Sequence, residues 1–347
     1  MSSYETRPSD RLYGLDALRR TALKAGAVAV SLLALGVAAP VTAQSSSNPT
    51  AADQAPAGPG GYVRPAAPGR LVEVVADRRL HIFCKGEGSG PTVIFEAGLS
   101  QYTANSTLAA TQDAIAGFAR ACTYDRSGMG WSDPTPEGWT YADRTRDLHA
   151  LLQAAGLEGP FVLVGHSLGG LLIRAYAEAY PGQVAGLVLV DGSSERDLPD
   201  FEAARGPTVS QIDAALAVSR PGVPIIGMPA GTSAEVQMAF TPEILRGVKA
   251  EFEALAGLDA ATLPPGAPGA LGQLPLIVIR RGRTMSPPSE ADLNHRRNQE
   301  SLAALSSNSV LIVAENSGHV IPLDEPQVVS DAVRRLLAAL NSPDRRL

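Results

Sequence analysis

Short apolar runs alternate with amphipathic helical patterns along most of this sequence. Runs rich in Val, Ile, Leu and Phe are typical of strands that are buried on both faces of a sheet. They predict strands at residues 71–76, 80–85, 92–98, 121–124, 161–165, 184–190, 274–279 and 310–314. The longer segments between them carry apolar residues at helical spacing. They predict helices at residues 108–119, 142–155, 168–180, 293–305 and 327–340.

The succession of strands and helices predicts an α/β fold. Its eight-stranded sheet should be mostly parallel and covered by helices on both faces. The functional loops of such a sheet gather at the carboxyl ends of its strands. The alternation is interrupted at about residues 192–273, a segment rich in Ala, Pro and Gly with helical patches near residues 211–219 and 243–258.

Residues 1–43 differ in composition from the rest of the chain. Arg19 and Arg20 precede an Ala/Val/Leu stretch at about residues 25–39, and the small residues after it are typical of a signal-peptidase site. This order predicts an export signal of the twin-arginine kind, although Ala22 stands where such signals favour Phe. The alternative is an uncleaved membrane anchor, for which about fifteen apolar residues are short.

Residues 44–70 consist mostly of Ser, Ala, Pro and Gly. Because this composition buries too little surface to offset chain entropy, we expect a flexible tether. The folded domain should then span about residues 71–340. The chain of 347 residues is 45% hydrophobic with a formal net charge of −6, which is typical of a globular protein and argues against nucleic acid as a partner.

One motif at the end of a predicted strand carries candidate chemistry. The sequence Gly165-His166-Ser167-Leu168-Gly169 has the pattern G-x-S-x-G and lies between an apolar strand and an Ala/Leu-rich helix. Small residues at such a junction allow a sharp turn that presents the serine hydroxyl above the sheet. The motif therefore predicts that Ser167 is a nucleophile, and the alternative is a small-residue turn with a structural serine.

Four segments together make the chain resemble the α/β-hydrolase superfamily over nearly all of residues 71–340. Besides the serine motif, they are FEAGLSQ at 95–101, YDRSGMGWSD at 124–133 and NSGHVIPLDEP at 316–326. The resemblance implies an oxyanion loop, a loop after the fourth strand and a histidine loop, in that order. It also implies that the insertion at residues 192–273 forms a helical cap over the active site. Met228, Met238, Phe240 and Leu245 either line an apolar pocket there or belong to the core.

A nucleophilic serine needs a base to accept its proton. The resemblance assigns this role to His319, in the loop after the last strand. His166 lies inside the serine motif, and we expect its ring to pack beside the serine. His81, His149 and His295 fall in strand or helix patterns, so we interpret them as structural or surface residues.

The acidic partner of the base departs from the common pattern of the family. Most relatives carry it a few residues after the strand at 274–279, where this chain has Met285. Some family members take the acid from the end of the preceding strand, which here is Asp191. Asp191 is therefore our candidate for orienting His319, although many relatives have an Asp there that only fixes a loop. Other carboxylates remain open for the role, namely Glu290, Asp292 and Glu195.

The family stabilises the oxyanion of the tetrahedral intermediate with two backbone N–H groups. The resemblance assigns them to Leu168 and Leu99. Relatives often have His-Gly before the second donor, whereas this chain has Glu96-Ala97-Gly98. Because the donor is backbone, the hole survives that change, and Arg126 is a candidate partner for Glu96.

The remaining signals concern cysteines, metals and cofactors. The resemblance places the strands of Cys84 and Cys122 side by side, so in an exported protein a disulfide and two buried thiols both stay open. No Cys/His cluster, H-E-x-x-H motif or early glycine pattern indicates a metal or nucleotide, so no cofactor is expected.

The sequence as a whole predicts an exported, periplasmic or extracellular serine hydrolase that cleaves a small-molecule carboxylic ester through an acyl-enzyme. Once the leader is removed, no stable membrane insertion is expected, because no further stretch is long and apolar enough. Amide, lactone or thioester hydrolysis and acyl transfer to an alcohol remain open on the same fold. A secreted binding protein without turnover is the alternative from another class, motivated by Met285.

Overall fold

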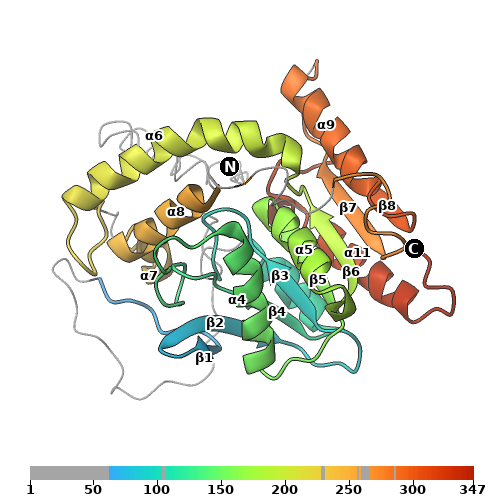
Figure 1. Cartoon of the computed structure of the whole chain (residues 1–347), viewed down its shortest axis with the longest axis horizontal. Helices are drawn as coiled ribbons and strands as arrows, with labels where there is room; N and C mark the ends of the chain where they lie inside the picture. The colour runs from blue at the N-terminus through green and yellow to red at the C-terminus, as the bar shows by residue number, and fades with distance from the viewer. Residues whose placement is uncertain (1–61, 104–106, 228–230, 256–257, 259–265, 285–286) are drawn as a thin grey trace, which may run out of the picture.

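An eight-stranded sheet forms the centre of the molecule (Figure 1). The computed structural model describes residues 62–103, 107–227, 231–255, 258, 266–284 and 287–347. The strand order is β1-β2-β4-β3-β5-β6-β7-β8, with β2 antiparallel to β1 and β4 and all other neighbours parallel. The predicted α/β fold with a mostly parallel sheet is confirmed. The strands are β1 Arg70–Val75, β2 Arg78–Lys85, β3 Val93–Glu96, β4 Ala121–Tyr124, β5 Phe161–His166, β6 Val184–Val190, β7 Leu276–Arg281 and β8 Ser309–Ala314.

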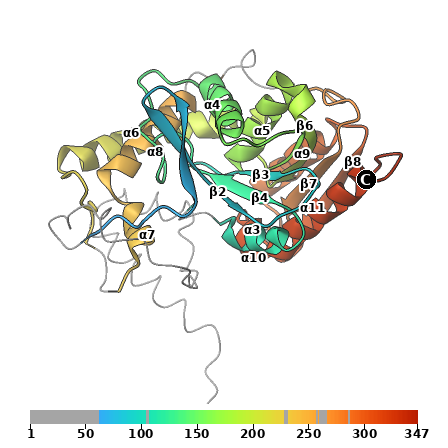
Figure 2. The same cartoon turned by 90° about the horizontal axis from the view of Figure 1, so that it is seen from below.

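Helices cover both faces of the sheet, as Figure 2 shows from the side. One face carries α4 Tyr141–Ala154, α5 Leu168–Ala179 and α9 Glu290–Ala303, whose apolar side chains pack on the sheet with Leu163 and Leu187. The other face carries α3 Ala109–Ala116, α10 Ile321–Asp324 and α11 Pro326–Leu340, which pack with Val162 and Val188. Because β5 and β6 are buried on both faces, they are almost entirely apolar.

Helix α11 shows how a sequence pattern becomes packing. Its buried side chains Val329, Val333 and Leu336 recur at helical spacing and form one apolar stripe against the sheet. Helix α9 begins three residues earlier than the pattern predicts, because Ser289 caps it by accepting a hydrogen bond from the amide of Asp292 at 3.1 Å.

The insertion between β6 and β7 forms a helical cap, seen beside the sheet in Figure 1. It holds η3 Glu195–Asp197, α6 Leu198–Ala217, α7 Ala234–Met238 and α8 Pro242–Leu255, whereas a further short turn, η2 Pro181–Gln183, precedes β6. Helix α6 is much longer than the predicted patch. Only Ile212 is buried along it, so no apolar stripe marks its length in the sequence.

The candidate pocket residues of the cap lie in its core. Met238, Phe240 and Leu245 are at most 4% exposed, and Met238 and Leu245 pack in one cluster with Leu168, which follows the serine. They therefore join the cap to the strand-to-helix turn of the sheet. Met228 lies outside the described residues.

Part of the segment predicted as a tether, residues 62–69, packs on the folded domain. Residues 44–61 lie outside the described part, as does the leader 1–43, but Tyr62 is 6% exposed and packs in the cap cluster. Trp131 Nε1 donates to the carbonyl of Pro65 at 2.8 Å, and Arg64 donates to the carbonyl of Gly130 at 2.6 Å. Residues 62–69 thus pack on the domain, because an aromatic anchor and these bonds offset their chain entropy.

Cys84 and Cys122 face each other across the antiparallel pair β2 and β4 and form a disulfide. Of the two alternatives that the sequence leaves open, the structure contains the bridge. Within the described part of the chain, no helix combines the length and apolar character that crossing a membrane requires.

Candidate active site

The serine motif forms a sharp turn between β5 and α5. Ser167 has a positive φ of 55° with ψ −122°, and its amide donates to the carbonyl of Val190 at 3.1 Å. Glycine is required on both sides of this turn. A Cβ on Gly165 would lie 2.5 Å from the carbonyl oxygen of Gly169, and one on Gly169 would lie 2.2 Å from that of Glu96. The sequence therefore presents the serine hydroxyl at the carboxyl edge of the sheet.

Three side chains from separate strand ends form one chain of hydrogen bonds. The hydroxyl of Ser167 donates to Nε2 of His319 at 3.0 Å, and Nδ1 of His319 donates to Oδ2 of Asp191 at 2.7 Å. A carboxylate only accepts, which assigns the imidazole proton to Nδ1 and leaves Nε2 free to accept. These are the residues predicted as nucleophile, base and acid.

Asp191 directly follows β6, whose last residue, Val190, pairs with His166 in the sheet register. Its amide donates to the carbonyl of Ile279 on β7 at 2.7 Å, and the residue has a positive φ of 44°. The side chain is fully buried, with 0% of its surface exposed. Position and burial thus aim it along the edge of the sheet, toward the loop of His319.

Two further residues, neither of which was predicted to lie at the site, contact the same carboxylate. Arg281, the last residue of β7, donates to Asp191 from its amide and from Nη1, both at 2.9 Å. His295 of α9 donates from Nε2 to Oδ1 at 2.8 Å. Burial alone would raise the pKa of Asp191. The hydrogen bonds from His295 and His319 outweigh this effect and hold the pKa well below its usual range. Asp191 is therefore ionised and shared among three donor residues.

His295, which the sequence pattern led us to interpret as a structural or surface residue, contacts the candidate acid. One signal in the sequence points to it. A helix that follows a parallel strand starts at the carboxyl edge of the sheet, and His295 lies in the second turn of such a helix.

The alternative carboxylates have other partners. Asp292 accepts hydrogen bonds from the amide and hydroxyl of Ser289 as part of a helix cap. Glu195 accepts from Arg174 at 3.1 Å. Glu290 is exposed in the first turn of α9. Within the described residues, no hydrogen bond or ion pair joins any of these three carboxylates to His319. Among the described residues, Asp191 is thus the carboxylate that His319 contacts.

His166 supports the loop of the candidate base. Its Nε2 donates to the carbonyl of His319 at 2.9 Å, and the two rings lie 5.0 Å apart. Burial, together with the nearby His319, lowers the pKa of His166 to about 4, so the ring is neutral near pH 7. His81 is buried, with Nδ1 2.8 Å from Oδ2 of Asp125, and the ring of His149 stacks on that of Tyr180.

The two candidate oxyanion donors belong to segments that touch. Leu168 is the first residue of α5, so its N–H has no carbonyl partner in the helix. Leu99 follows β3 in the loop that we call the oxyanion loop, residues 97–101. Because Gly169 lies against Glu96, the first turn of α5 is packed on the start of this loop. Arg126 donates to Glu96 at 2.7 Å, so the partner expected for Glu96 is present.

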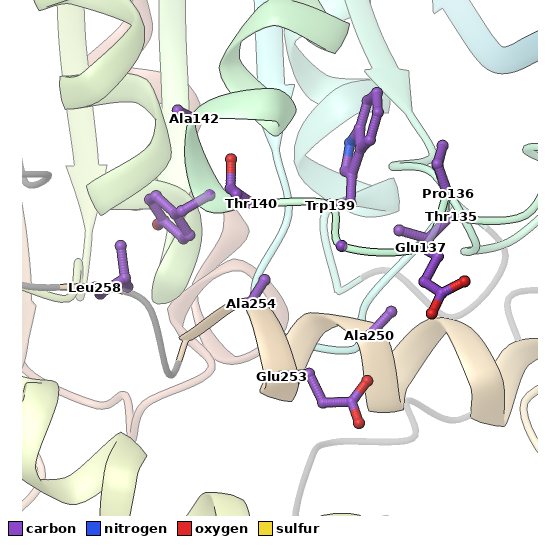
Figure 3. Close-up of a pocket in the computed structure, with 12 residues that line it drawn as sticks. Thr135, Pro136, Glu137, Trp139, Thr140, Ala142, Ala250, Glu253, Ala254 and Leu258 are labelled. Carbon is purple, nitrogen blue, oxygen red and sulfur yellow. The ribbon is translucent and has the colours of Figure 1, made fainter.

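A cavity of about 540 Å³ lies between the cap helix α8 and residues 135–142 (Figure 3). The loop 135–142, which includes Trp139, forms one wall, and Ala250, Glu253 and Ala254 of α8 form the other. None of its lining residues belongs to the serine, histidine and aspartate chain. His319, in contrast, is itself open, with 48% of its side chain exposed.

The described residues contain no group of three or more His, Cys, Asp or Glu side chains placed to hold a metal ion.

Comparisons with known proteins bear on the family and the fold. A model of the Alpha/beta hydrolase family matches residues 93–332. The uncharacterized protein YqjL of Bacillus subtilis (strain 168) is 29% identical over 250 residues, which cover 71% of this chain and 83% of YqjL.

Two solved structures share the fold. A thermophilic esterase from Thermogutta terrifontis has a TM-score of 0.58 at 21% identity and covers 80% of this chain and 100% of its own. The enol-lactonase from Burkholderia xenovorans LB400 has a TM-score of 0.56 at 18% identity and covers 77% of this chain and 99% of its own. At such identities the likeness is one of architecture.

Proposed function

Because the chain belongs to the alpha/beta hydrolase family, we propose that it is an exported serine hydrolase that cleaves a carboxylic ester through an acyl-enzyme. The observation that carries this proposal is the unbroken hydrogen-bond chain from Ser167 through His319 to Asp191, at 3.0 and 2.7 Å. Nucleophile, base and orienting acid lie within the range that proton transfer requires.

The first half of the reaction forms the acyl-enzyme. Ser167 Oγ attacks the ester carbonyl carbon while its proton moves to His319 Nε2, and the carbonyl π electrons move onto oxygen. When the tetrahedral intermediate collapses, the carbon–oxygen bond to the alcohol breaks. His319 Nε2 gives its proton to the departing alkoxide, so an alcohol leaves and the acyl group stays on Ser167.

The second half repeats these steps with water. His319 Nε2 accepts a proton from the water that attacks the acyl carbonyl, and then returns it to Ser167 Oγ as the carboxylic acid departs. Asp191 stabilises the imidazolium in both halves. Its ionised, buried carboxylate suits that role.

The amides of Leu99 and Leu168 are the proposed oxyanion donors. Preorganised donors of this kind contribute roughly 3 to 4 kcal/mol each in hydrolases. The packing of Gly169 on Glu96, which brings the two segments together, supports this assignment.

The serine itself restricts the chemistry. A hydroxyl at the turn suits acyl transfer, whereas α/β hydrolases that open epoxides or remove halides carry an aspartate there. A small-molecule ester is the proposed substrate. The binding-protein alternative rested on Met285, and it loses that support because Asp191 contacts His319 instead.

A fluorophosphonate probe tests the proposal, since it phosphonylates a serine that a neighbouring base activates. We expect stoichiometric labelling of the wild type, none of Ser167→Ala, and full labelling of Ser193→Ala. Ser193 is a matched control, because it lies close to Ser167 and the substitution keeps the amide that donates to the Ser167 carbonyl at 2.8 Å. Folded wild-type protein without label would contradict the proposal. A screen of p-nitrophenyl esters of increasing chain length then defines the acyl group.

Export rests on the leader in residues 1–43 and on the Cys84–Cys122 bridge, which suits an oxidising compartment. We expect intact-mass measurement of periplasmic material to give a chain that starts near Gln44. Full-length protein found in the cytosol would contradict this localisation.

A further inference from the structure

Four charged side chains are buried together between the sheet and the cap. Glu96 ends β3, Arg126 follows β4, Arg144 lies on α4 and Glu251 lies on the cap helix α8. None is more than 4% exposed. Arg126 Nε donates to Glu251 at 2.6 Å, and Arg144 lies 3.6 Å from the same oxygen. We call these four residues, two arginines and two glutamates, the buried charge cluster.

Burying such a cluster costs free energy, and hydrophobic side chains of equal size in its place often leave a fold equally stable or more stable. The cluster is therefore weak evidence for stability, and its contacts indicate which groups it positions. Burial alone would raise the pKa of Glu251, but Arg126 and Arg144 hold it below its usual value. Both members of the Arg126–Glu251 pair are therefore charged.

The cluster holds the peptide group that carries the Leu99 amide. Arg126 donates from Nη1 to the carbonyl of Ala97 and from Nη2 to the carbonyl of Gly98, both at 2.7 Å. The carbonyl of Gly98 and the N–H of Leu99 belong to one planar trans peptide and point in opposite directions. A guanidinium that fixes the carbonyl therefore fixes the direction of the N–H.

The following peptide group is held from the cap. Oε2 of Glu251 accepts the amide of Ser100 at 2.7 Å, and Ser100 has a positive φ of 62°. The peptide planes on both sides of Leu99 are thus gripped by two side chains that are bonded to each other. One of these side chains comes from α8, more than 150 positions along the chain from the loop.

We propose that Arg126 and Glu251 are positioning residues for the oxyanion amide of Leu99, so that the cap helix α8 sets the geometry of transition-state stabilisation. The inference rests on the proposed serine hydrolase function. Displacement of α8 would then disturb the oxyanion loop directly through Glu251.

The test compares Glu251→Gln with Glu253→Gln. Glu253 lies on the same helix (Figure 3). Its half-exposed side chain pairs with Lys249. For the best p-nitrophenyl ester, Glu251→Gln should lower kcat about 10- to 100-fold and leave KM within about threefold. A trifluoromethyl ketone with the same acyl chain, whose serine adduct carries an oxyanion, should bind more weakly by the same factor as kcat/KM falls. Glu253→Gln should match the wild type in each measurement.

A merely structural role would lower the unfolding temperature of Glu251→Gln and leave its kcat and ketone affinity unchanged at a temperature where it is folded. That result would overturn the inference. If the Gln variant does not fold, Glu251→Asp replaces it, because its shorter carboxylate keeps the charge but does not span both Ser100 and Arg126, and the same selective loss is expected. Wild type and Glu253→Gln that both lack turnover would instead refute the proposed function.

Discussion

Arg281 gives the sharpest test of the electrostatics around the candidate acid. Its Nη1 and Nδ1 of His319 share Oδ2 of Asp191, at 2.9 and 2.7 Å. The ionised Asp191 favours protonation of the His319 imidazole, whereas the guanidinium of Arg281 opposes it. Arg281→Met removes this charge and keeps the backbone amide that donates to Oδ1 at 2.9 Å.

The size of the effect follows from these distances. Two cationic nitrogens that share one oxygen lie no more than about 5.6 Å apart, which corresponds to about 3 kcal/mol of repulsion at an effective dielectric constant of about 20. His319 is 48% and Arg281 23% exposed in their side chains, so solvent reduces this to about 1 kcal/mol. That free energy corresponds to about 0.7 pH unit.

The direction of the shift is upward. His319 must be neutral to accept the proton of Ser167, and loss of the guanidinium stabilises the protonated ring. The acid limb of the kcat/KM profile of Arg281→Met should therefore move about 0.7 unit to higher pH. The assay measures p-nitrophenyl ester hydrolysis from pH 4.5 to 9 in buffers of constant ionic strength.

Arg283→Met serves as the matched control, because Arg283 is 64% exposed and lies 3.9 Å from Asp324. Its profile should overlay that of the wild type. If the acid limb of the Arg281→Met profile stays in place or moves to lower pH, this electrostatic explanation is wrong. A fall in the plateau alone would reflect lost positioning and not the charge.

Three further predictions concern the acid, a buried histidine and the disulfide. Asp191→Asn should lower kcat by about 10⁴ with its circular dichroism spectrum intact, and a near-normal rate would move the role of acid to another carboxylate. His166 should destabilise the fold on acidification, because its pKa of about 4 lies below the unfolded value of 6.5 and the unfolded chain therefore binds the proton first. Its contribution at pH 5 is about 2 kcal/mol below that at pH 7, so urea unfolding of His166→Gln should depend less on pH than the wild type, and equal slopes would contradict this. Replacing Cys84 and Cys122 by Ser should lower the free energy of unfolding by up to about 4 kcal/mol in the chain-entropy model, whereas no change in urea unfolding would show that the bridge does not constrain the unfolded chain.

The sequence is most informative where one pattern implies one structure. The buried runs of β5 and β6 are read correctly because strands covered on both faces need to be apolar throughout. The G-x-S-x-G turn is local, so its glycines and serine can be interpreted without knowledge of distant residues. The family resemblance then orders the loops around it.

Contacts that depend on the tertiary structure cannot be predicted from such local patterns. His295 and Arg281 meet Asp191 only because α9 and β7 bring distant positions to one edge of the sheet. Helix α6 has almost no buried stripe, and residues 62–69 look like a tether in composition but are held by Tyr62. Glu251 is one of several acidic residues in the cap, and nothing in its neighbourhood along the chain links it to Ser100.

Rapid-quench mass spectrometry of the wild type during turnover of a p-nitrophenyl ester shows directly whether Ser167 carries the acyl group. We expect a burst of about one equivalent of p-nitrophenol per chain and an acyl group on the peptide that contains Ser167. Turnover with the acyl group on any other residue, or with no covalent intermediate under conditions that give a burst, would contradict this expectation.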